Sequence, residues 1–208
     1  MTNHKRSERI FLTAKTRMVA EARARSLNSF LNILTAWYSF CLIAVSVANL
    51  SGILRHGTIE FSATLMSIAL FGVSLFLLGG RLEQRAEEYR KCYLALKAIY
   101  HSSNTEDEKM LEYEQEIAKY PNHAPIDYDL MIFETHSRGQ KLWNEEGEIK
   151  QTSQIEKRAK RQNLKAFVGR LLAIILPGIL FCTSYMLSVP FADTAEGKSE
   201  LEADVDGD

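Results

Sequence analysis

Hydrophobic and polar positions are separated along this chain into long blocks. Three stretches contain no Asp, Glu, Lys or Arg: 29 residues from Ser26 to Leu54, 20 from Phe61 to Gly80 and 22 from Leu171 to Ala192. At 1.5 Å of rise per helical residue, about 20 residues cross a hydrocarbon core of ~30 Å. The pattern therefore predicts three membrane-spanning helices.

The first two stretches predict a transmembrane hairpin rather than a secretory signal. Seven Lys and Arg lie within residues 1–25, and the apolar stretch that follows exceeds the 7–15 residues of a signal peptide. Six residues then lead to the second stretch. We expect a basic cytoplasmic helix over 1–25 and a retained hairpin over 26–80, with spans at 26–54 and 61–80.

The third stretch predicts a C-terminal span over 166–192. It contains Pro177, which a spanning helix tolerates because neighbouring groups satisfy the freed carbonyl. A re-entrant or interfacial segment is the alternative. The acidic residues of 193–208 predict a disordered tail.

The distribution of Lys and Arg predicts the topology. Residues 1–25 hold seven and residues 81–170 hold sixteen, whereas the loop between the first two spans has only Arg55 and the tail only Lys198. Positive residues accumulate on the cytoplasmic side of membrane proteins. The N-terminus and the middle region are therefore expected in the cytoplasm, and the C-terminus outside.

The cytoplasmic region, 81–165, opens with a heptad-like seam. Apolar residues recur at spacings of 4, 3, 4, 3 and 4, which predicts a coiled-coil-like helix continuing straight out of the second span. Two interpretations are open: the seam packs within a helical bundle of one chain, or it joins several copies. Its members are Leu82, Ala86, Tyr89, Tyr93, Leu96 and Tyr100.

Further helices are expected along the cytoplasmic region. Thr105 with Glu108 predicts a capping box, and the helix that it opens should end at the turn 121–125. The next helix is expected from Asp127 to near Asn144, and a last helix should begin near residue 153 and run directly into the third span. Because no strand pattern is seen, the expected fold class is an all-α membrane protein.

Composition and motifs argue against enzymatic and nucleic-acid functions. With 25 Lys and Arg against 26 Asp and Glu, the net charge of −1 does not favour direct nucleic-acid binding. Phosphate-binding, zinc-protease and nucleophile-elbow motifs are absent from the sequence, so no catalytic residue or cofactor is expected. Cys41, Cys92 and Cys182 are expected to be reduced, because none pairs with another in an oxidising compartment.

One group of side chains around the turn is a candidate metal site. It consists of His123, Asp127, Asp129 and His136. Metal binding requires ligands that converge, and their spacing is irregular. We prefer the interpretation in which Asn122 and Asp127 cap helix ends and His123 forms hydrogen bonds across the turn. A membrane enzyme would require the four to converge.

Polar residues of the first span lie along one stripe. Polar and small residues join helices in bilayers by close packing and hydrogen bonds, which is one interpretation. The other is that the stripe lines a water-filled path in an oligomer, as in a weakly selective channel. The stripe contains Asn28, Asn32, Thr35, Ser39, Ser46 and Asn49.

The turn, with the helices around it, carries a family resemblance over about residues 8–170. Pro121, Asn122, His123 and Asp127, preceded by a basic helix, a two-span hairpin and a Tyr-rich helix, resemble the SLATT family. These are the SMODS and SLOG-associating two-transmembrane effectors of bacterial conflict systems. Lys15-Thr16-Arg17 fits the same pattern. The resemblance implies that the four turn residues act in structure or in sensing the trigger.

The resemblance also implies a function. It is that of an oligomeric effector that forms a pore in the bacterial inner membrane, or disrupts it, during anti-phage abortive infection. The partners implied are the lipid bilayer, further copies of the chain, and a nucleotide-signal synthase, sensor or reverse transcriptase. The alternative is a scaffold without a pore that recruits a polymerase or reverse transcriptase to the membrane, where the basic runs 5–25 and 157–165 would bind anionic lipid or a nucleic-acid partner.

Overall fold

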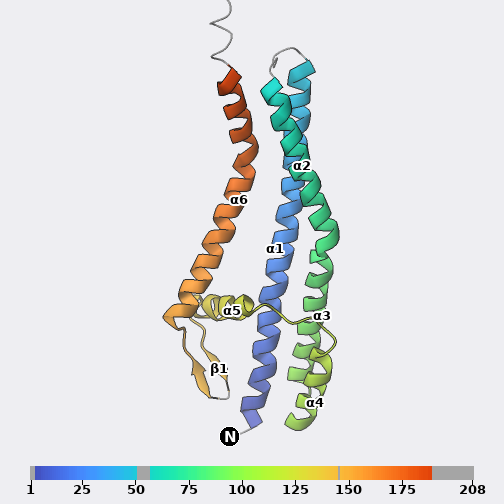
Figure 1. The fold of residues 1–208 in the computed structure, drawn as a ribbon. Coiled ribbons are helices and arrows are strands. Elements are labelled where there is room, and N and C mark those ends of the chain that lie inside the picture. The colour runs from blue at the N-terminus through green and yellow to red at the C-terminus, as the bar shows by residue number, and fades with distance from the viewer. Residues whose placement is uncertain (1–2, 51–56, 145, 189–208) are drawn as a thin grey trace, which may run out of the picture. The chain divides into compact units, whose positions relative to one another are not determined.

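The computed structural model describes residues 3–50, 57–144 and 146–188, most of them helical (Figure 1). Three of its helices are long and apolar enough to span a membrane, as the sequence predicts. In chain order the elements are α1 (Asn3–Leu50), α2 (Gly57–Gly80), α3 (Leu82–His101), α4 (Glu106–Ile117), α5 (Pro125–Ser137), β1 (Leu142–Asn144), β2 (Gly147–Ile149) and α6 (Ser153–Ser188).

The chain divides into two compact units. The head unit comprises Met1–Phe30 and Gly80–Val168, and the spanning unit comprises Leu31–Gly79 and Gly169–Asp208. Both α1 and α6 contribute one part to each unit. The predicted tail, 193–208, the last residues of the first and third predicted spans and the first two residues of the loop between the first two spans lie outside the described residues.

In the head unit α1 is buried on two faces. One face places Ile10 and Ala14 against buried residues of α3 and α4, and the other places Leu12 against α5 and β1. The N-terminal part of α1 is therefore the centre of the head unit and not a peripheral basic arm.

The seam of α3 packs inside the same chain. Ala86 and Leu96 are fully buried, and Tyr93 and Tyr100 pack against the cluster formed with α1 and α4. The capping box at the start of α4 is present, with the Thr105 hydroxyl and the Glu108 carboxylate both engaged. These contacts favour the intramolecular interpretation of the seam, and self-association through it remains a prediction.

The helix predicted from Asp127 to Asn144 is wrong in its second half. Helix α5 ends at Ser137, and Gly139 follows with a φ of 71°. A glycine with positive φ just past the last turn closes a helix by letting the chain reverse. The chain then forms an antiparallel hairpin in which Leu142 pairs with Ile149, and Leu142 is 2% exposed.

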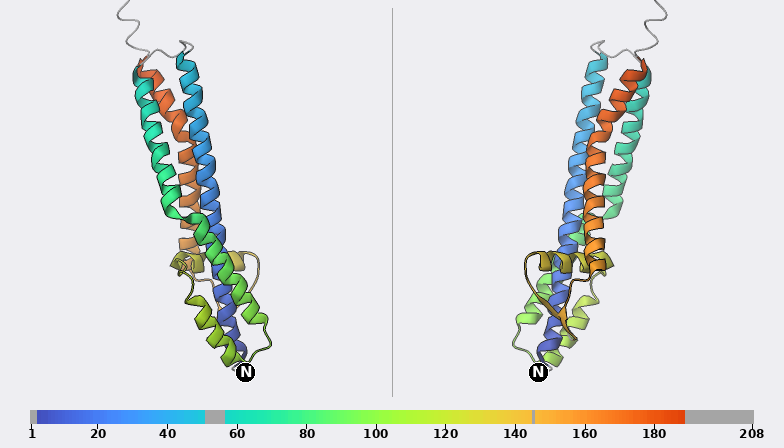
Figure 2. Two further views of the ribbon diagram at one scale, coloured as in Figure 1. Left: turned by 90° about the vertical axis from the view of Figure 1, so that its right-hand side faces the viewer. Right: turned by 90° about the vertical axis from the view of Figure 1, so that its left-hand side faces the viewer.

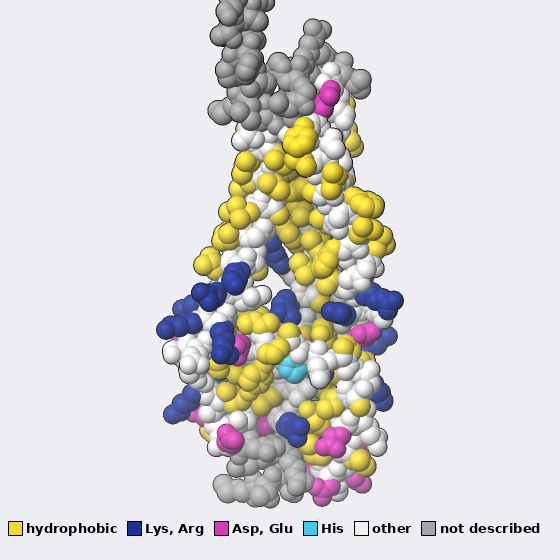
Figure 3. Space-filling model, viewed as in Figure 1, with side chains coloured by type: hydrophobic (Ala, Val, Ile, Leu, Met, Phe, Trp, Pro, Cys, Tyr) yellow, Lys and Arg dark blue, Asp and Glu magenta, His cyan; other side chains and the backbone are white. Residues whose placement is uncertain are grey.

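The spanning unit leaves most of its large hydrophobic side chains uncovered. Only 11%, 11% and 6% of the most apolar windows of the three candidate spans are buried. Figure 3 shows these side chains gathered over the spanning parts of the helices, with the Lys and Arg side chains elsewhere. Such a surface requires lipid or further protein to cover it.

The sequence predicts that the second span continues straight into α3, but in the structure the two helices are separate. Arg81 lies between α2 and α3 with φ 45° and ψ 35°, a left-handed conformation. Figure 2 draws α2 and α3 as two separate helices. Residues other than glycine adopt this conformation at a cost of roughly 1–2 kcal/mol. In contrast, α1 and α6 are each one helix from the head unit into the spanning unit.

Candidate functional site

Four charged or titratable side chains meet around the turn before α5. We refer to Arg17, Arg23, His123 and Asp127 as the charge cluster. The two arginines come from α1, and the other two residues belong to the turn and to the first turn of α5. All four lie in the head unit, so segments about 100 residues apart in sequence hold one another there.

Arg17 is the buried cation of the cluster. It is 1% exposed, and its Nη1 donates a hydrogen bond to the carbonyl oxygen of Pro121. Its guanidinium carbon lies 5.6 Å from the centre of the Tyr89 ring, within the range of a cation–π interaction. The Tyr89 hydroxyl in turn donates to the Asn122 carbonyl at 3.3 Å. Two helices, α1 and α3, therefore hold the backbone of the turn.

Asp127 is the buried anion. It is fully buried, and its Oδ2 accepts hydrogen bonds from the Ala124 N–H at 2.9 Å and from Arg23 Nη2 at 3.2 Å. Arg23 Nε lies 3.0 Å from Oδ1. A carboxylate at the third helical residue that reaches back to the N-cap N–H satisfies one of the unpaired donors at a helix start. Asp127 therefore caps α5 and fastens it to α1.

Burial and charge shift both titratable groups of the cluster. Burial raises the pKa of the Asp127 carboxyl above its ordinary value, against the lowering effects of Arg23 and of the Ala124 N–H. Burial also lowers the pKa of the His123 imidazole, and Arg17 lowers it further, whereas Asp127 opposes the shift. In the described part of the chain, no hydrogen-bond partner faces His123 Nδ1. Burial and Arg17 therefore favour the neutral form of the His123 imidazole.

The metal site considered from the sequence does not form. Asp129 pairs instead with Arg158 at 3.6 Å, and His136 Nδ1 lies 3.0 Å from its own helix's Ile132 carbonyl. Among the described residues, no group of His, Cys, Asp and Glu could hold a metal ion. Asp127 caps α5 as the sequence predicts, but the prediction that Asn122 caps a helix is wrong, because α4 ends with Ala118 as its C-cap and Ala124 is the N-cap of α5. The hydrogen bond predicted for His123 across the turn remains without support.

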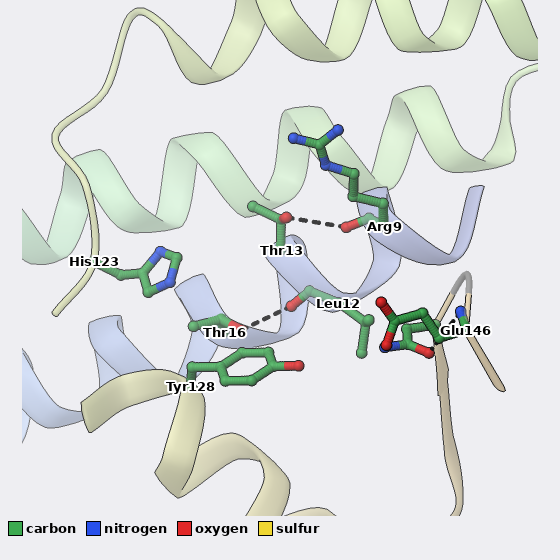
Figure 4. A pocket seen from close by; sticks show the side chains of 8 residues that line it. Arg9, Leu12, Thr13, Thr16, His123, Tyr128 and Glu146 are labelled. Atoms are coloured by element: carbon green, nitrogen blue, oxygen red, sulfur yellow. Dashed lines mark hydrogen bonds between the residues drawn. The ribbon is translucent and has the colours of Figure 1, made fainter. Parts of the chain in front are cut away.

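A pocket of about 420 Å³ opens beside the turn in the head unit (Figure 4). Its walls come from α1, the turn, α5 and the β1–β2 hairpin, so one occupant would touch all four. Thr13 and Thr16 each donate their hydroxyl to a carbonyl one turn earlier in α1. The lining residues are Arg9, Leu12, Thr13, Thr16, His123, Tyr128, Asn144 and Glu146.

The predicted polar stripe lies on α1, mostly within the spanning unit. Thr35, Ser39 and Ser46 donate to carbonyls four residues earlier in the helix, so their hydroxyls are satisfied without a neighbour. Asn32 is exposed and has no hydrogen-bond partner in the described part of the chain. Asn28 belongs to the head unit, and Asn49 is exposed near the end of α1.

Sequence reasoning noticed Arg17 as part of a family pattern but missed its burial, and it missed the role of Arg23. A signal for Arg17 exists: Ile10, Ala14 and Arg17 follow one another at spacings of 4 and 3, so all three share one helix face. Ile10 and Ala14 on this face are buried against α3 and α4. No comparable signal marks Arg23, which is partly exposed.

Comparison with known families agrees with the resemblance noted in the sequence. The model of "SMODS and SLOG-associating 2TM effector domain family 5" matches residues 2–183. Neither the curated proteins nor the solved structures contain a match to this chain. The family match covers well over half of the sequence, and the protein with this charge cluster and these apolar helices therefore belongs to the SLATT family of membrane effectors.

Proposed function

We propose that this protein is an oligomeric effector that opens a pore in the bacterial inner membrane, or disrupts it, when it is triggered during phage infection. The observation that carries the proposal is the environment of Asn32. This amide is exposed and unpartnered, among the described residues, on a helix that is long and apolar enough to span a membrane. Membership of an effector family also supports this proposal.

An unpartnered asparagine is costly in hydrocarbon. Transfer of an amide out of water without a hydrogen-bond partner costs roughly 2–7 kcal/mol. Thr35 and Ser39 avoid this cost through carbonyls of their own helix, but Asn32 does not. A second copy of the chain or water in a pore would supply the missing partners, and lipid tails would not.

The position of Asn32 on the helix fits such an interface. Successive helical residues are rotated by about 100°, so Asn32 lies roughly 120° around α1 from Tyr38. Tyr38 is 5% exposed and bonds to α6 within the same chain. The face of Asn32 is therefore a different face, which is open to another copy.

The trigger is proposed to act at the turn of the charge cluster. Arg17 and Arg23 of α1 bind the backbone of Pro121 and the carboxylate of Asp127. The same uninterrupted helix carries Asn32 into the spanning unit. A displacement of the turn would therefore act on a helix that is continuous in both units, which is a route for switching between two states.

Membrane potential tests the pore. Cells expressing the full chain, alone and with its genomic neighbours, are followed with a voltage-sensitive dye. Asn32→Leu should abolish depolarisation and growth arrest, because it removes the amide that forms hydrogen bonds with water or with a second copy of the chain. Asn32→Gln, which keeps the amide, should retain both effects.

Ile33→Leu is the matched control. Ile33 is the next residue of the same helix and is 64% exposed, so this variant changes an apolar surface without changing polarity. Each variant is checked for equal amounts in the membrane fraction. Depolarisation by Asn32→Leu at the level of the unchanged protein would overturn the pore, and partner recruitment without depolarisation would favour the scaffold instead.

A further inference from the structure

The third long helix, α6, lacks one of its backbone hydrogen bonds, and a side chain of the first helix, α1, supplies a replacement. Pro177 lies inside α6 and is fully buried. Proline has no N–H, so the carbonyl four residues earlier, that of Ala173, loses its helical donor. The Tyr38 hydroxyl of α1 donates to this carbonyl at 3.0 Å. Both helices are present here through their spanning-unit parts.

The contact between Tyr38 and α6 is shielded from solvent, so the Ala173 carbonyl needs this replacement hydrogen bond. Tyr38 is 5% exposed and the Pro177 ring is buried. A backbone carbonyl in an apolar environment must find a partner within the protein, and polar side chains of neighbouring helices supply one next to a proline. The donor and the defect therefore match one another in position and in chemistry.

A second hydrogen bond beside it differs in kind. Trp37 Nε1 donates to the Ile174 carbonyl at 3.1 Å. Gly178, which follows the proline, retains its N–H, so the Ile174 carbonyl has its ordinary helical donor. Trp37 is 42% exposed. Its bond is an addition to a carbonyl that is already satisfied, and it provides an internal control.

We infer that Tyr38 is the positioning residue that docks the third helix on the first, in a register set by Pro177. The membrane part of the protein is then a unit of three helices, although its family is defined by two spans. Separation of α6 from α1 would leave the Ala173 carbonyl bare, so the two helices stay paired. One consequence rests on the proposed function: the three-helix unit, and not the hairpin alone, is what assembles with other copies.

A double-mutant cycle on the full chain tests the pairing. Tyr38→Phe, Pro177→Ala and the double variant are unfolded by SDS titration in mixed micelles and followed by circular dichroism. Tyr38→Phe should lower the folding equilibrium constant roughly 3- to 18-fold, from measured interhelical hydrogen bonds of about 0.6–1.7 kcal/mol. In the Pro177→Ala background the loss should fall below about twofold, because alanine returns the N–H to the Ala173 carbonyl.

Trp37→Phe serves as the control for this cycle. It removes a bond to a carbonyl that keeps its helical donor, so its effect should be the same in the unchanged chain and in the Pro177→Ala background. If Tyr38→Phe alone fails to insert into membranes, the double variant should recover insertion. An equal loss from Tyr38→Phe in both backgrounds, no loss in either, or failure of the double variant to recover would overturn the inference. None of these measurements depends on conductance, so a failed pore proposal leaves them readable.

Discussion

The contact between Arg23 and Asp127 predicts an asymmetry between two substitutions of one ion pair. Asp127 is fully buried, whereas the side chain of Arg23 is 41% exposed. Arg23→Met leaves a buried carboxylate without its cation, and breaking a buried pair in this way costs about 3–5 kcal/mol. We expect about 3 kcal/mol of unfolding free energy to be lost, because the Ala124 N–H still bonds to Asp127.

Asp127→Asn should cost less. The asparagine oxygen can still accept from the Ala124 N–H, so α5 keeps its cap. Arg23 can turn to water, so its charge is not stranded, and exposed ion pairs contribute only about 0–1 kcal/mol. We expect a loss of about 1.5 kcal/mol, near the low end for a hydrogen bond to a charged group. In the Asp127→Asn background, Arg23→Met should then have little effect.

The pH dependence separates this explanation from simple loss of packing. Burial raises the pKa of Asp127 above its reference value of 3.8, and Arg23 opposes the rise. A carboxyl with a raised pKa in the folded state destabilises that state as pH rises above the unfolded pKa. Without Arg23 the pKa rises further, so the destabilisation by Arg23→Met should be greatest at neutral pH and shrink on acidification.

The assay is denaturant unfolding in detergent micelles, followed by tryptophan fluorescence. Trp143 lies in β1 of the head unit and Trp37 in the spanning unit, so a Trp37→Phe background makes the signal specific to the head unit. The cycle is measured at neutral and at mildly acidic pH. An Asp127→Asn loss equal to or greater than that of Arg23→Met, or a loss by Arg23→Met that does not change with pH, would refute the reasoning.

Three further predictions concern single sites of the head unit. The pKa of His123 is lowered from 6.5, so the stability that the neutral imidazole contributes is present above that pH and is lost as the pH falls below it. His123→Gln should remove this part of the pH dependence of the unfolding free energy, measured by denaturant unfolding between about pH 5 and 8. Arg81→Gly should raise the melting temperature, with about 1 kcal/mol gained by relieving the positive φ, and Arg81→Ala should not. Thr105→Ala removes the capping box of α4 and should cost about 1 kcal/mol, visible as faster amide exchange in its first turn, whereas Ser103→Ala outside the box should leave that exchange unchanged.

The membrane helices could be predicted well from the sequence, because each prediction rests on a long run of residues. The structure contains a long apolar helix for each of the three charge-free stretches, and it contains the capping box predicted from Thr105 and Glu108. The β1–β2 hairpin was missed because strands of three residues are too short to show alternation. Gly139 was the available signal: a glycine that can adopt positive φ ends α5 before the hairpin begins.

The charge cluster could be predicted only in part. The capping role of Asp127 follows from its place after a proline-rich turn, but its ionic partner lies 104 residues away on α1. Arg17 is a cation on a buried face, and sequence patterns assign cations to solvent. Its position becomes reasonable only when the Pro121 carbonyl and the Tyr89 ring are known to surround it, because tertiary contacts can outweigh the ordinary preference of a charge for water.

The two kinds of connection between the units have different mechanical consequences. A continuous helix transmits rotation and tilt, and α1 carries the arginines of the charge cluster and the polar stripe on one such element. The α2–α3 connection is interrupted at Arg81, whose backbone conformation breaks the helical ladder. In the proposed mechanism, a change at the turn would reach the membrane through α1, which is continuous in both units, and not through α2, which ends at Gly80. Under the inference drawn for Tyr38, the effect would then extend to α6, because the Tyr38 hydroxyl bonds to the Ala173 carbonyl within the spanning unit.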